Sequence, residues 1–466
     1  MKANVRSKMI RFATLFIFVL MLTGAWAQIS TNALLTLANT NGTTMSLSIS
    51  NSGNQTWVIQ SSSNLTSWTT VETLKVFNGS YQRSYTNSAG GNLYYRANFN
   101  ATNQTIADTT TNALGLPATN YNYSNPALPV EFYVNPILAE DNMPVNGPNA
   151  DPTTDADATL GRVLFYDKRL STNQTISCAS CHQQVYGFSD PRQFSVGYNG
   201  SLGTRNAMGL SNARWYQRRH FFWDERANTL EDQTLMPIQN PIEMGMTLDA
   251  LTNRLAAEPF YTNLFALAFG SPVITTNGIS KALAQFVRSI VTTQSKYDLG
   301  LTNNFTNFTD SENLGRLIFF GLTNFPPNPP ANCSGCHASD NFVPGPAVNN
   351  NGLEYPYVDL GVGGITGNTN QYGLFKVPSL RNIALTAPYM HDGRFTNLAQ
   401  VVAFYSSGVV FNPNLSPPLV AHGGTSALRL NLTADQQVAL VAFLNTLTDT
   451  NLVTNPQLSD PFNYGH

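Results

Sequence analysis

The chain has 466 residues, a formal net charge of −2 and only 11% charged residues, so much of its surface must be neutral and polar. A chain without a basic excess is a poor match for the phosphate backbone of DNA or RNA, and we expect no nucleic-acid partner. Its length corresponds to about three domains of ordinary size.

Residues 1–27 have the pattern of a secretory signal peptide. Basic residues between Lys2 and Arg11 precede the short apolar run Phe12–Leu22, and Ala25–Ala27 is a small-x-small cleavage site. The apolar run is too short to span a bilayer comfortably, so we expect cleavage after residue 27 and no membrane anchor after processing. A retained anchor is the alternative interpretation. The signal predicts that the protein is exported to the periplasm.

Residues 28–100 are expected to form a small all-β sandwich domain. Met45–Ile49 and the run around Trp57–Gln60 alternate apolar and polar residues as half-buried strands do, and Leu93–Ala97 has the pattern of a closing strand. The segment Trp57–Trp68 resembles small β-sandwich modules that are appended to exported bacterial proteins. Because no cluster of titratable residues lies here, we predict an accessory or docking role.

Residues 101–130 are rich in Asn, Thr and Pro and are expected to form a linker. An internal repeat follows. Leu160–Tyr166 and Leu314–Phe320 share a Leu-Gly-Arg start and helical apolar spacing, and each precedes a C-x-x-C-H motif. Residues 227–300 also predict mainly helix, for example over Ile279–Thr292.

The two C-x-x-C-H motifs account for every cysteine in the chain: Cys178, Cys181 and His182 form the first, and Cys333, Cys336 and His337 form the second. This is the attachment sequence of c-type haem, in which two thiols add to the haem vinyl groups and the histidine ligates the iron. A zinc site built from both cysteine pairs is the alternative. Zinc pairs are usually separated by roughly 15–20 residues, far fewer than here. We therefore predict two covalently bound haem c groups.

A helix, a loop and a C-x-x-C-H motif form the opening of a cytochrome c domain. We therefore predict a mainly α fold, with two cytochrome c-like haem domains preceded by the small all-β sandwich. The expected bounds are 131–300 for the N-terminal cytochrome c domain, 301–450 for the C-terminal cytochrome c domain and 451–466 for a tail.

Over about residues 135–450 the chain resembles the bacterial di-haem cytochrome c peroxidases, whose relatives include MauG, the maturation enzyme of methylamine dehydrogenase. The resemblance rests on both haem motifs and on segments that follow one another in the family's order: Leu160–Arg162, Phe221–Asp224, Asn240–Gly245, Phe375–Asn382 and Leu385–Phe395. It implies a peroxidatic haem in the first haem domain and an electron-transfer haem in the second.

The resemblance also implies the activity: a periplasmic enzyme that reduces hydrogen peroxide to water with electrons from a small cytochrome c or a cupredoxin. A MauG-like oxidase that uses peroxide to modify a protein partner is the alternative. An electron-transfer protein without catalysis is a third possibility, against which the acid–base residues below argue. A homodimer is the candidate assembly.

Three residues receive catalytic roles from the resemblance. Glu243 is expected to take the first proton from peroxide and return it to the departing hydroxide, which suits a carboxylate in a partly dry pocket. Gln233 is its expected hydrogen-bonding partner. Trp223 matches the tryptophan between the haems and is expected to relay charge. The alternative roles are helix capping for Glu243 and interface packing alone for Trp223.

The resemblance further implies a calcium ion between the domains, which suits a hard cation held by oxygen atoms. Asn206 matches the side-chain ligand, and Thr386 and Pro388 match backbone carbonyl ligands. His182 and His337 match the proximal ligands of the first and second haem.

Three positions depart from the family pattern. Tyr198 stands where many relatives have a displaceable histidine, so we expect a peroxide haem without a histidine cap. Tyr405 stands 14 residues after His391, where many relatives have a methionine that ligates the second haem. Tyr405 is our preferred sixth ligand and Met390 is its competitor, since a thioether is a usual haem ligand. Glu225 replaces the glycine that usually follows the Trp-Asp pair, and the sequence alone offers no explanation for it.

Overall fold

The structure is a computed structural model. It describes residues 34–39, 44–51, 55–63, 67, 69–76, 79–86, 94–100, 114–129, 153–216, 218–323, 330–338, 342 and 348–463. The expected signal peptide and much of the expected linker lie outside the described residues. The chain divides into two compact units, Met1–Asn103 and Gln104–His466. Among the described residues, no helix has the length and apolar character needed to cross a membrane.

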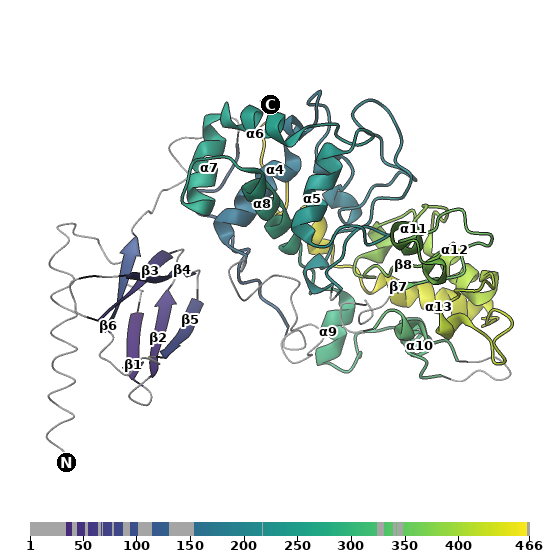
Figure 1. Ribbon diagram of the computed structural model, residues 1–466. Coiled ribbons are helices and arrows are strands. Elements are labelled where there is room, and N and C mark those ends of the chain that lie inside the picture. Colours follow the sequence, from purple (N-terminus) through teal and green to yellow (C-terminus); the bar gives the residue numbers. More distant parts are fainter. Residues whose placement is uncertain are drawn as a thin grey trace, which may run out of the picture. The chain divides into compact units, whose positions relative to one another are not determined.

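The first unit contains two antiparallel sheets of three strands each (Figure 1). One sheet has the order β1–β2–β5, with bounds Leu34–Asn39, Thr44–Asn51 and Gly79–Thr86. The other has the order β4–β3–β6, with bounds Thr69–Val76, Gln55–Ser62 and Tyr94–Asn100. The alternating runs of the sequence lie in β2 and β3. Most side chains of these strands lie outside the described residues, so the packing of the two sheets as a sandwich stays a prediction.

The second unit is mainly helical, as predicted. Its α-helices are α4 (Asp155–Tyr166), α5 (Leu230–Gln239), α6 (Leu248–Ala256), α7 (Pro259–Phe269), α8 (Thr276–Arg288), α9 (Lys296–Thr302), α10 (Asp310–Phe319), α11 (Val362–Thr366), α12 (Leu398–Ala403) and α13 (Ala434–Asn445). Irregular loops and short 3-10 turns connect them. The strands β7 (Val348–Asn349) and β8 (Phe375–Lys376) form a small antiparallel pair.

The internal repeat of the sequence becomes a repeated helix pair. The Leu-Gly-Arg helices α4 and α10 begin at Thr154 and Thr309, whose hydroxyls accept from backbone N–H groups of the first turn. Helix α4 packs on α8 and helix α10 packs on α13, so each haem motif follows a helix that is fixed by a partner (Figure 1). Helix α8 ends four residues earlier than the apolar pattern suggested, where a run of β-branched residues begins.

Glycine makes both crossings possible. A Cβ atom on Gly161 would lie 1.9 Å from the carbonyl oxygen of Ala282, and one on Gly315 would lie 1.9 Å from that of Ala439. Each glycine faces a phenylalanine one turn further along the partner helix, Phe286 or Phe443. The backbones therefore approach in the same way in both halves of the unit.

Two separate hydrophobic cores surround these crossings. The first is built on α4, α7 and α8 with Phe165, Phe188 and Phe286 at its centre. The second is built on α10 and α13 with Phe319, Phe342 and Phe443 in mutual ring contact. Two cores agree with two haem domains, whose exact bounds stay a prediction.

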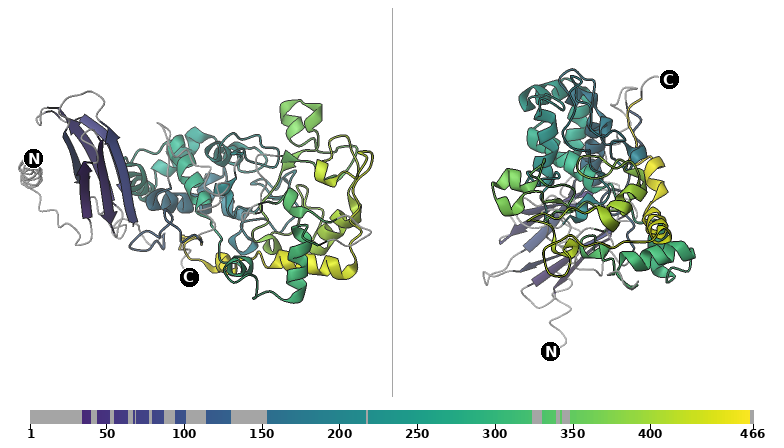
Figure 2. Two further views of the ribbon diagram at one scale, coloured as in Figure 1. Left: turned by 90° about the horizontal axis from the view of Figure 1, so that it is seen from below. Right: turned by 90° about the vertical axis from the view of Figure 1, so that its right-hand side faces the viewer.

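The C-terminal segment returns to the first core and not to the second. The Tyr166 hydroxyl donates to the carbonyl oxygen of Leu458 at 2.7 Å, and the Arg162 guanidinium donates to that of Pro456 at 2.8 Å. Part of the expected linker also packs here, since Leu114 and Tyr123 are buried and belong to the same core. Figure 2 shows the yellow C-terminal end beside the blue and teal elements of the first half.

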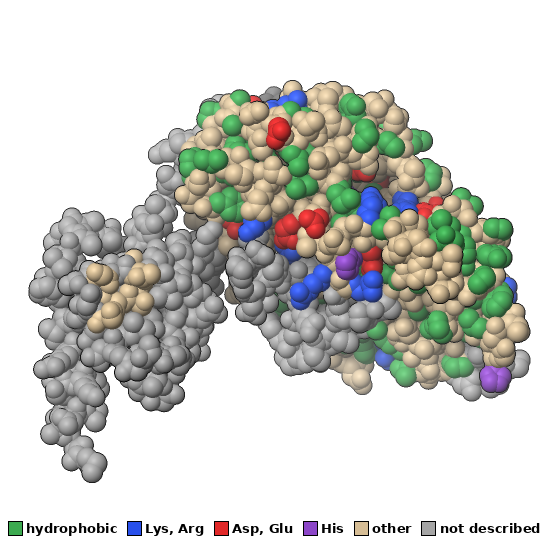
Figure 3. All heavy atoms as spheres, viewed as in Figure 1, with side chains coloured by type: hydrophobic (Ala, Val, Ile, Leu, Met, Phe, Trp, Pro, Cys, Tyr) green, Lys and Arg blue, Asp and Glu red, His purple; other side chains and the backbone are tan. Residues whose placement is uncertain are grey.

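Charged side chains are sparse on the face of the second unit that Figure 3 shows, in keeping with the composition. Several charges instead form ion pairs inside the fold. Arg381 donates to both carboxylate oxygens of Asp298 at 2.6 Å, and both side chains are almost completely buried. Arg205 binds Asp224 and Asp359, which come from distant parts of the chain. Such pairs fix the register of the segments that they join.

The close approach of the helices at Gly161 predicts that adding one methyl group there strongly lowers the stability of the protein. We expect Gly161→Ala to lower the free energy of unfolding by about 3 kcal/mol or more, the upper end of overpacking costs, because its Cβ would meet backbone atoms that cannot rotate away. Thermal unfolding, monitored by circular dichroism, measures this loss of stability. Gly203→Ala is the control, since its Cβ would have no neighbour closer than 3.7 Å. Equal midpoints for the two variants would contradict the prediction.

Candidate functional site

The first C-x-x-C-H motif lies on a short 3-10 turn, Cys178–Ser180, that follows α4 and its loop. The backbone N–H of His182 donates to the carbonyl oxygen of Cys178 at 2.9 Å, which folds the histidine back toward the cysteines. Its ring Nδ1 lies 2.9 Å from the carbonyl oxygen of Phe188. A carbonyl can only accept, so Nδ1 carries the proton and Nε2 keeps a free lone pair that suits a metal.

The second motif has the same geometry. It lies on the 3-10 turn Cys333–Gly335, and the His337 N–H donates to the carbonyl oxygen of Cys333 at 2.8 Å. Its Nδ1 lies 3.3 Å from the carbonyl oxygen of Phe342. The chain therefore presents two half-buried histidines with the same backbone and Nδ1 contacts, each beside two free cysteines.

Burial controls the protonation of both motifs. It lowers the pKa of His182, and it lowers the pKa of His337 to about 4, so both rings are neutral at physiological pH. It raises the pKa of the Cys178 and Cys333 thiols to about 12. A neutral imidazole is the form that ligates iron, and four thiols held in two pairs match two haem attachment sites.

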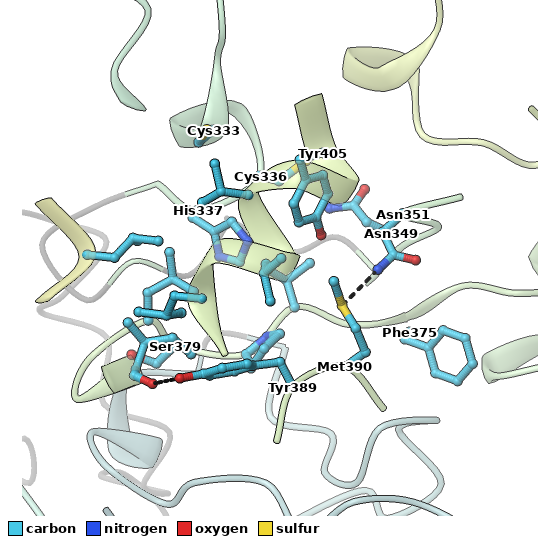
Figure 4. A pocket seen from close by; sticks show the side chains of 18 of the residues that line it. Cys333, Cys336, His337, Asn349, Asn351, Phe375, Ser379, Tyr389, Met390 and Tyr405 are labelled. Atoms are coloured by element: carbon cyan, nitrogen blue, oxygen red, sulfur yellow. Dashed lines mark hydrogen bonds between the residues drawn. The ribbon is translucent and has the colours of Figure 1, made fainter. Parts of the chain in front are cut away.

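A cavity of about 250 Å³ opens beside the second motif. Cys333, Cys336 and His337 line it together with apolar side chains from α12, α13 and the 428–432 segment. Figure 4 shows the His337 ring pointing into this cavity, with Tyr405 and Met390 on the walls. An apolar slot with a histidine on one wall and two cysteines at its edge fits a covalently attached haem.

Both candidate sixth ligands of the second haem line this cavity, and each lies in a segment whose backbone conformation is uncommon. Tyr405 lies in a π-helical turn, Phe404–Gly408, that follows α12, and Met390 has a φ of +75°. Irregular backbone of both kinds concentrates at functional sites. Asn351 donates from its amide to the Met390 sulfur at 3.4 Å, and burial raises the pKa of the Tyr405 phenol to about 12. Which residue ligates the haem stays a prediction.

Glu243 lies next to the first motif. Its carboxylate accepts a hydrogen bond from the Asn240 amide at 2.7 Å, and its charge acts on the thiols of Cys178 and Cys181. Burial raises the pKa of Glu243, and the Arg226 charge opposes part of that rise. The carboxylate is therefore a stronger base than an exposed glutamate, as a proton carrier requires.

Asn240, which the sequence did not single out, is the residue that bonds to Glu243. Gln233 lies on α5, whose C-terminal cap is Asn240, and among the described residues no hydrogen bond joins Gln233 to Glu243. Tyr198 is close as well, because its backbone N–H donates to the carbonyl oxygen of Glu243 at 2.8 Å. The residue that replaces the displaceable histidine thus lies against the segment that carries the candidate acid–base group.

Trp223 lines the cavity of the second motif from the first half of the unit. Its indole N–H donates to the backbone carbonyl oxygen of Asn206 at 2.8 Å, and its ring centroid lies 6.5 Å from that of His391. His391 stacks on Phe375 at 3.9 Å. The indole therefore lies where the two halves of the helical unit meet. This position suits both the charge relay and the interface packing considered for Trp223.

The three candidate calcium ligands line the same cavity as Trp223. The Asn206 amide donates to the backbone carbonyl oxygens of Arg192 and Gln193 at 3.2 and 3.3 Å, and its backbone N–H donates to that of His391. Within the described ranges, no group of three or more His, Cys, Asp or Glu side chains could hold a metal ion. A calcium site built from amide and carbonyl oxygens stays a prediction.

The structure explains Glu225. Its carboxylate is buried, accepts from the Tyr216 hydroxyl, and pairs with the Arg218 guanidinium at 2.6 Å. The Lys376 ammonium lies 3.8 Å from the centre of the Tyr216 ring, and burial lowers the pKa of Lys376 to about 8. Glu225 therefore supplies a negative charge to a region that holds the cations Arg218 and Lys376. No pattern in the sequence indicates this role.

Comparisons with known proteins agree with this geometry. A sequence model of the family described as di-haem cytochrome c peroxidase matches residues 155–305. The chain is 33% identical over 315 residues to methylamine utilization protein MauG of Methylorubrum extorquens, covering 67% of this chain and 84% of that protein. It is 34% identical over 312 residues to cytochrome c551 peroxidase of Nitrosomonas europaea, covering 66% and 84%.

A solved structure of a MauG-like protein associated with microbial copper homeostasis is similar as well. It has a TM-score of 0.61 and 34% identity, and the match covers 73% of this chain and 99% of that one. The residues that the family model matches, 155–305, all lie within the second unit.

The cavity beside the second motif contains two candidates for the sixth ligand of the second haem, and substitutions distinguish them. A phenolate stabilises ferric iron more than a thioether does, so Tyr405→Phe should change the absorption and electron paramagnetic resonance spectra of the second haem and raise its potential. Met390→Leu should leave both nearly as they are. The opposite result, with a strong effect of Met390→Leu alone, would assign the methionine as the ligand.

Proposed function

We propose, since the chain belongs to the di-haem cytochrome c peroxidase and MauG family, that it reduces hydrogen peroxide to water with electrons from a small redox protein. Two haems, held by the cysteine pairs and by His182 and His337, would bind peroxide and store electrons. The other steps fall to side chains of this chain. The observation that carries the proposal is the half-buried carboxylate of Glu243 beside Cys178, whose pKa is raised.

Glu243 acts on the proton of peroxide. Its raised pKa makes the carboxylate a competent acceptor, and the proton returns to the second oxygen when the O–O bond breaks and water leaves. Asn240 holds one carboxylate oxygen in place through its 2.7 Å hydrogen bond. A fixed base needs no reorganisation when the proton moves, which is the advantage of a partly buried site.

Trp223 connects the two halves. Its indole faces the cavity of the second motif and is oriented by the backbone of Asn206. An aromatic ring at this position can pass an electron without leaving its hydrogen bond. We assign Trp223 the relay of electrons between the two haem sites, of which the second would take electrons from the donor and the first would supply them to peroxide.

Several finer assignments accompany this proposal. The protein acts in the periplasm, reached by means of the signal peptide, and receives electrons from a small cytochrome c or a cupredoxin. A calcium ion held by Asn206, Thr386 and Pro388 supports the junction of the two haem domains. The strands of the first unit form a β-sandwich with an accessory or docking role.

A second candidate function is a MauG-like oxidation of a protein partner by peroxide. The observation that favours it is the half-buried tyrosine in the cavity of the second motif, Tyr405, where a methionine would suit an electron-accepting haem better. Turnover with peroxide and a reduced cytochrome separates the two functions. Rapid oxidation of the cytochrome supports the peroxidase, and its absence with peroxide still consumed supports the oxidase.

The acid–base assignment predicts the effect of Glu243→Gln. The amide keeps the size and loses the base, so peroxide turnover should fall about 10²–10⁴-fold with both haems still attached. The measurement is steady-state turnover, with intact mass to count the haems. Asp249→Asn, an exposed carboxylate on α6, is the control and should retain the parent rate.

The pH profile provides a second readout for Glu243. A base works only when deprotonated, so the rate should fall as the pH drops through the raised pKa of Glu243, at a higher pH than for an ordinary glutamate. This acid limb should disappear in Glu243→Gln. A Gln variant within about threefold of the parent rate would give Glu243 a structural role.

Tyr198 predicts the activation behaviour. With a tyrosine where a displaceable histidine would lie, the fully oxidised enzyme should react with peroxide without prior reduction. Stopped-flow absorption of the haem bands after mixing oxidised protein with peroxide tests this. If the bands change only after one haem has been reduced, Tyr198 or another group caps the iron, and Tyr198→Phe should then restore the direct reaction.

A further inference from the structure

Glu225 is held at a conformational cost. Its φ of +55° lies in the left-handed region that a residue with a side chain rarely adopts, and its side chain is only 3% exposed. Strained backbone and a buried charge persist where the surrounding contacts compensate for them. The contacts of this carboxylate therefore indicate what the residue does.

The principal contact is with a buried phenol. Tyr216 is 3% exposed, and its hydroxyl donates a short hydrogen bond to one oxygen of the Glu225 carboxylate. The Arg218 Nε group lies 2.8 and 2.7 Å from the two carboxylate oxygens, which fixes their direction. A tyrosine with a carboxylate aimed at its hydroxyl has a proton acceptor already in place.

This pair belongs to the same packed segment as Trp223. Glu225 follows Trp223 by two residues, and the Tyr216 ring packs on Phe221 with a centroid distance of 6.1 Å. Lys376 joins them from the other side, because its backbone N–H donates to the Trp223 carbonyl oxygen at 2.8 Å and its ammonium lies over the Tyr216 ring.

The two aromatic residues differ in where a proton could go. The Trp223 N–H donates to a backbone carbonyl, which is far too weak a base to take the proton. The Tyr216 hydroxyl donates to a carboxylate, which can take it. Trp223 can therefore only lose and regain an electron, whereas Tyr216 can lose an electron and a proton together.

We propose that Tyr216 and Glu225 form a proton-coupled redox site that accepts an oxidising equivalent from Trp223. The inference rests on the proposed function, in which peroxide is the oxidant. One electron passes from Tyr216 to the oxidised indole, which returns to its neutral form. The phenolic O–H bond breaks, and the proton forms an O–H bond with Glu225. An electron from the donor protein reverses both changes.

Lys376 makes the carboxylate indispensable. An ammonium group 3.8 Å from the ring centre opposes any positive charge on that ring. Electron loss without proton loss is therefore disfavoured, and the neutral tyrosyl radical is accessible only because Glu225 takes the proton.

The test is electron paramagnetic resonance of the di-haem protein frozen milliseconds after mixing with one equivalent of peroxide. The parent should show a radical signal that narrows when its tyrosines are ring-deuterated. Tyr216→Phe should lose this signal. Glu225→Gly should lose it as well. This variant relieves the positive φ but removes the partner of Arg218, so circular dichroism confirms its folding before the radical is measured.

Tyr261→Phe is the matched control. Tyr261 is also buried and donates to a carboxylate, Asp167, at 2.5 Å, but it lies on α7 and its acceptor follows α4, so neither residue belongs to the Trp223 segment. This variant should keep the radical. A signal that survives Tyr216→Phe, that survives Glu225→Gly, or that Tyr261→Phe also removes would overturn the proposal. So would peroxide consumption by the parent without any tyrosyl radical.

A photochemical arm separates this inference from the proposed function. Flash oxidation with a ruthenium complex and a sacrificial acceptor requires no peroxide reaction. If the parent fails to consume peroxide but still forms the radical under flash oxidation, with the same loss in Tyr216→Phe and Glu225→Gly, the redox site stands and the peroxidase assignment falls. Absence of the radical in both arms overturns the redox site.

Discussion

The close crossing of two helix pairs at a glycine is the constraint on which the helical unit depends. With Gly161 against Ala282 and Gly315 against Ala439, two backbones touch without an intervening side chain. Each crossing sets the start of the loop that carries a C-x-x-C-H motif and the helix that closes the same core. The two motifs adopt the same geometry because the same constraint acts twice.

The junction of the two halves depends on a different interaction. Charges are few in this chain, yet Arg205, Asp224 and Asp359 form a linked set beside Trp223, and Arg381 and Asp298 form an almost completely buried pair. Ion pairs of this kind are costly to break on one side, since the remaining charge is left without a partner in a medium of low dielectric. They hold the segments of both halves in register around the indole, where small displacements would matter most.

Much of this organisation could be predicted from the sequence. The haem motifs have a fixed spacing, and the Leu-Gly-Arg helices have a clear apolar period, so the sequence indicates both. Contacts between distant loops have no such pattern. The amide of Asn240 at Glu243, the contact of Asn351 with Met390 and the pairing of Glu225 with Tyr216 each depend on how irregular segments fold against one another.

Two segments contribute more to the first core than their composition indicates. Residues 114–129 are polar and rich in turn formers, and the last residues look like a tail, yet both contribute backbone carbonyls and buried rings to the first core. The bonds from Tyr166 and Arg162 go to main-chain oxygens, which every sequence possesses. Because these acceptors are main-chain atoms, the pattern of side chains in the sequence does not reveal them.

The return of the C-terminal segment to the first core has a consequence for the order of assembly. Leu452 and Leu458, which follow both haem motifs in the sequence, complete a core whose first helix begins at Asp155. The first core is therefore incomplete until the chain beyond the second motif has been made. Until then the first motif lacks part of the packing that surrounds it in the finished fold.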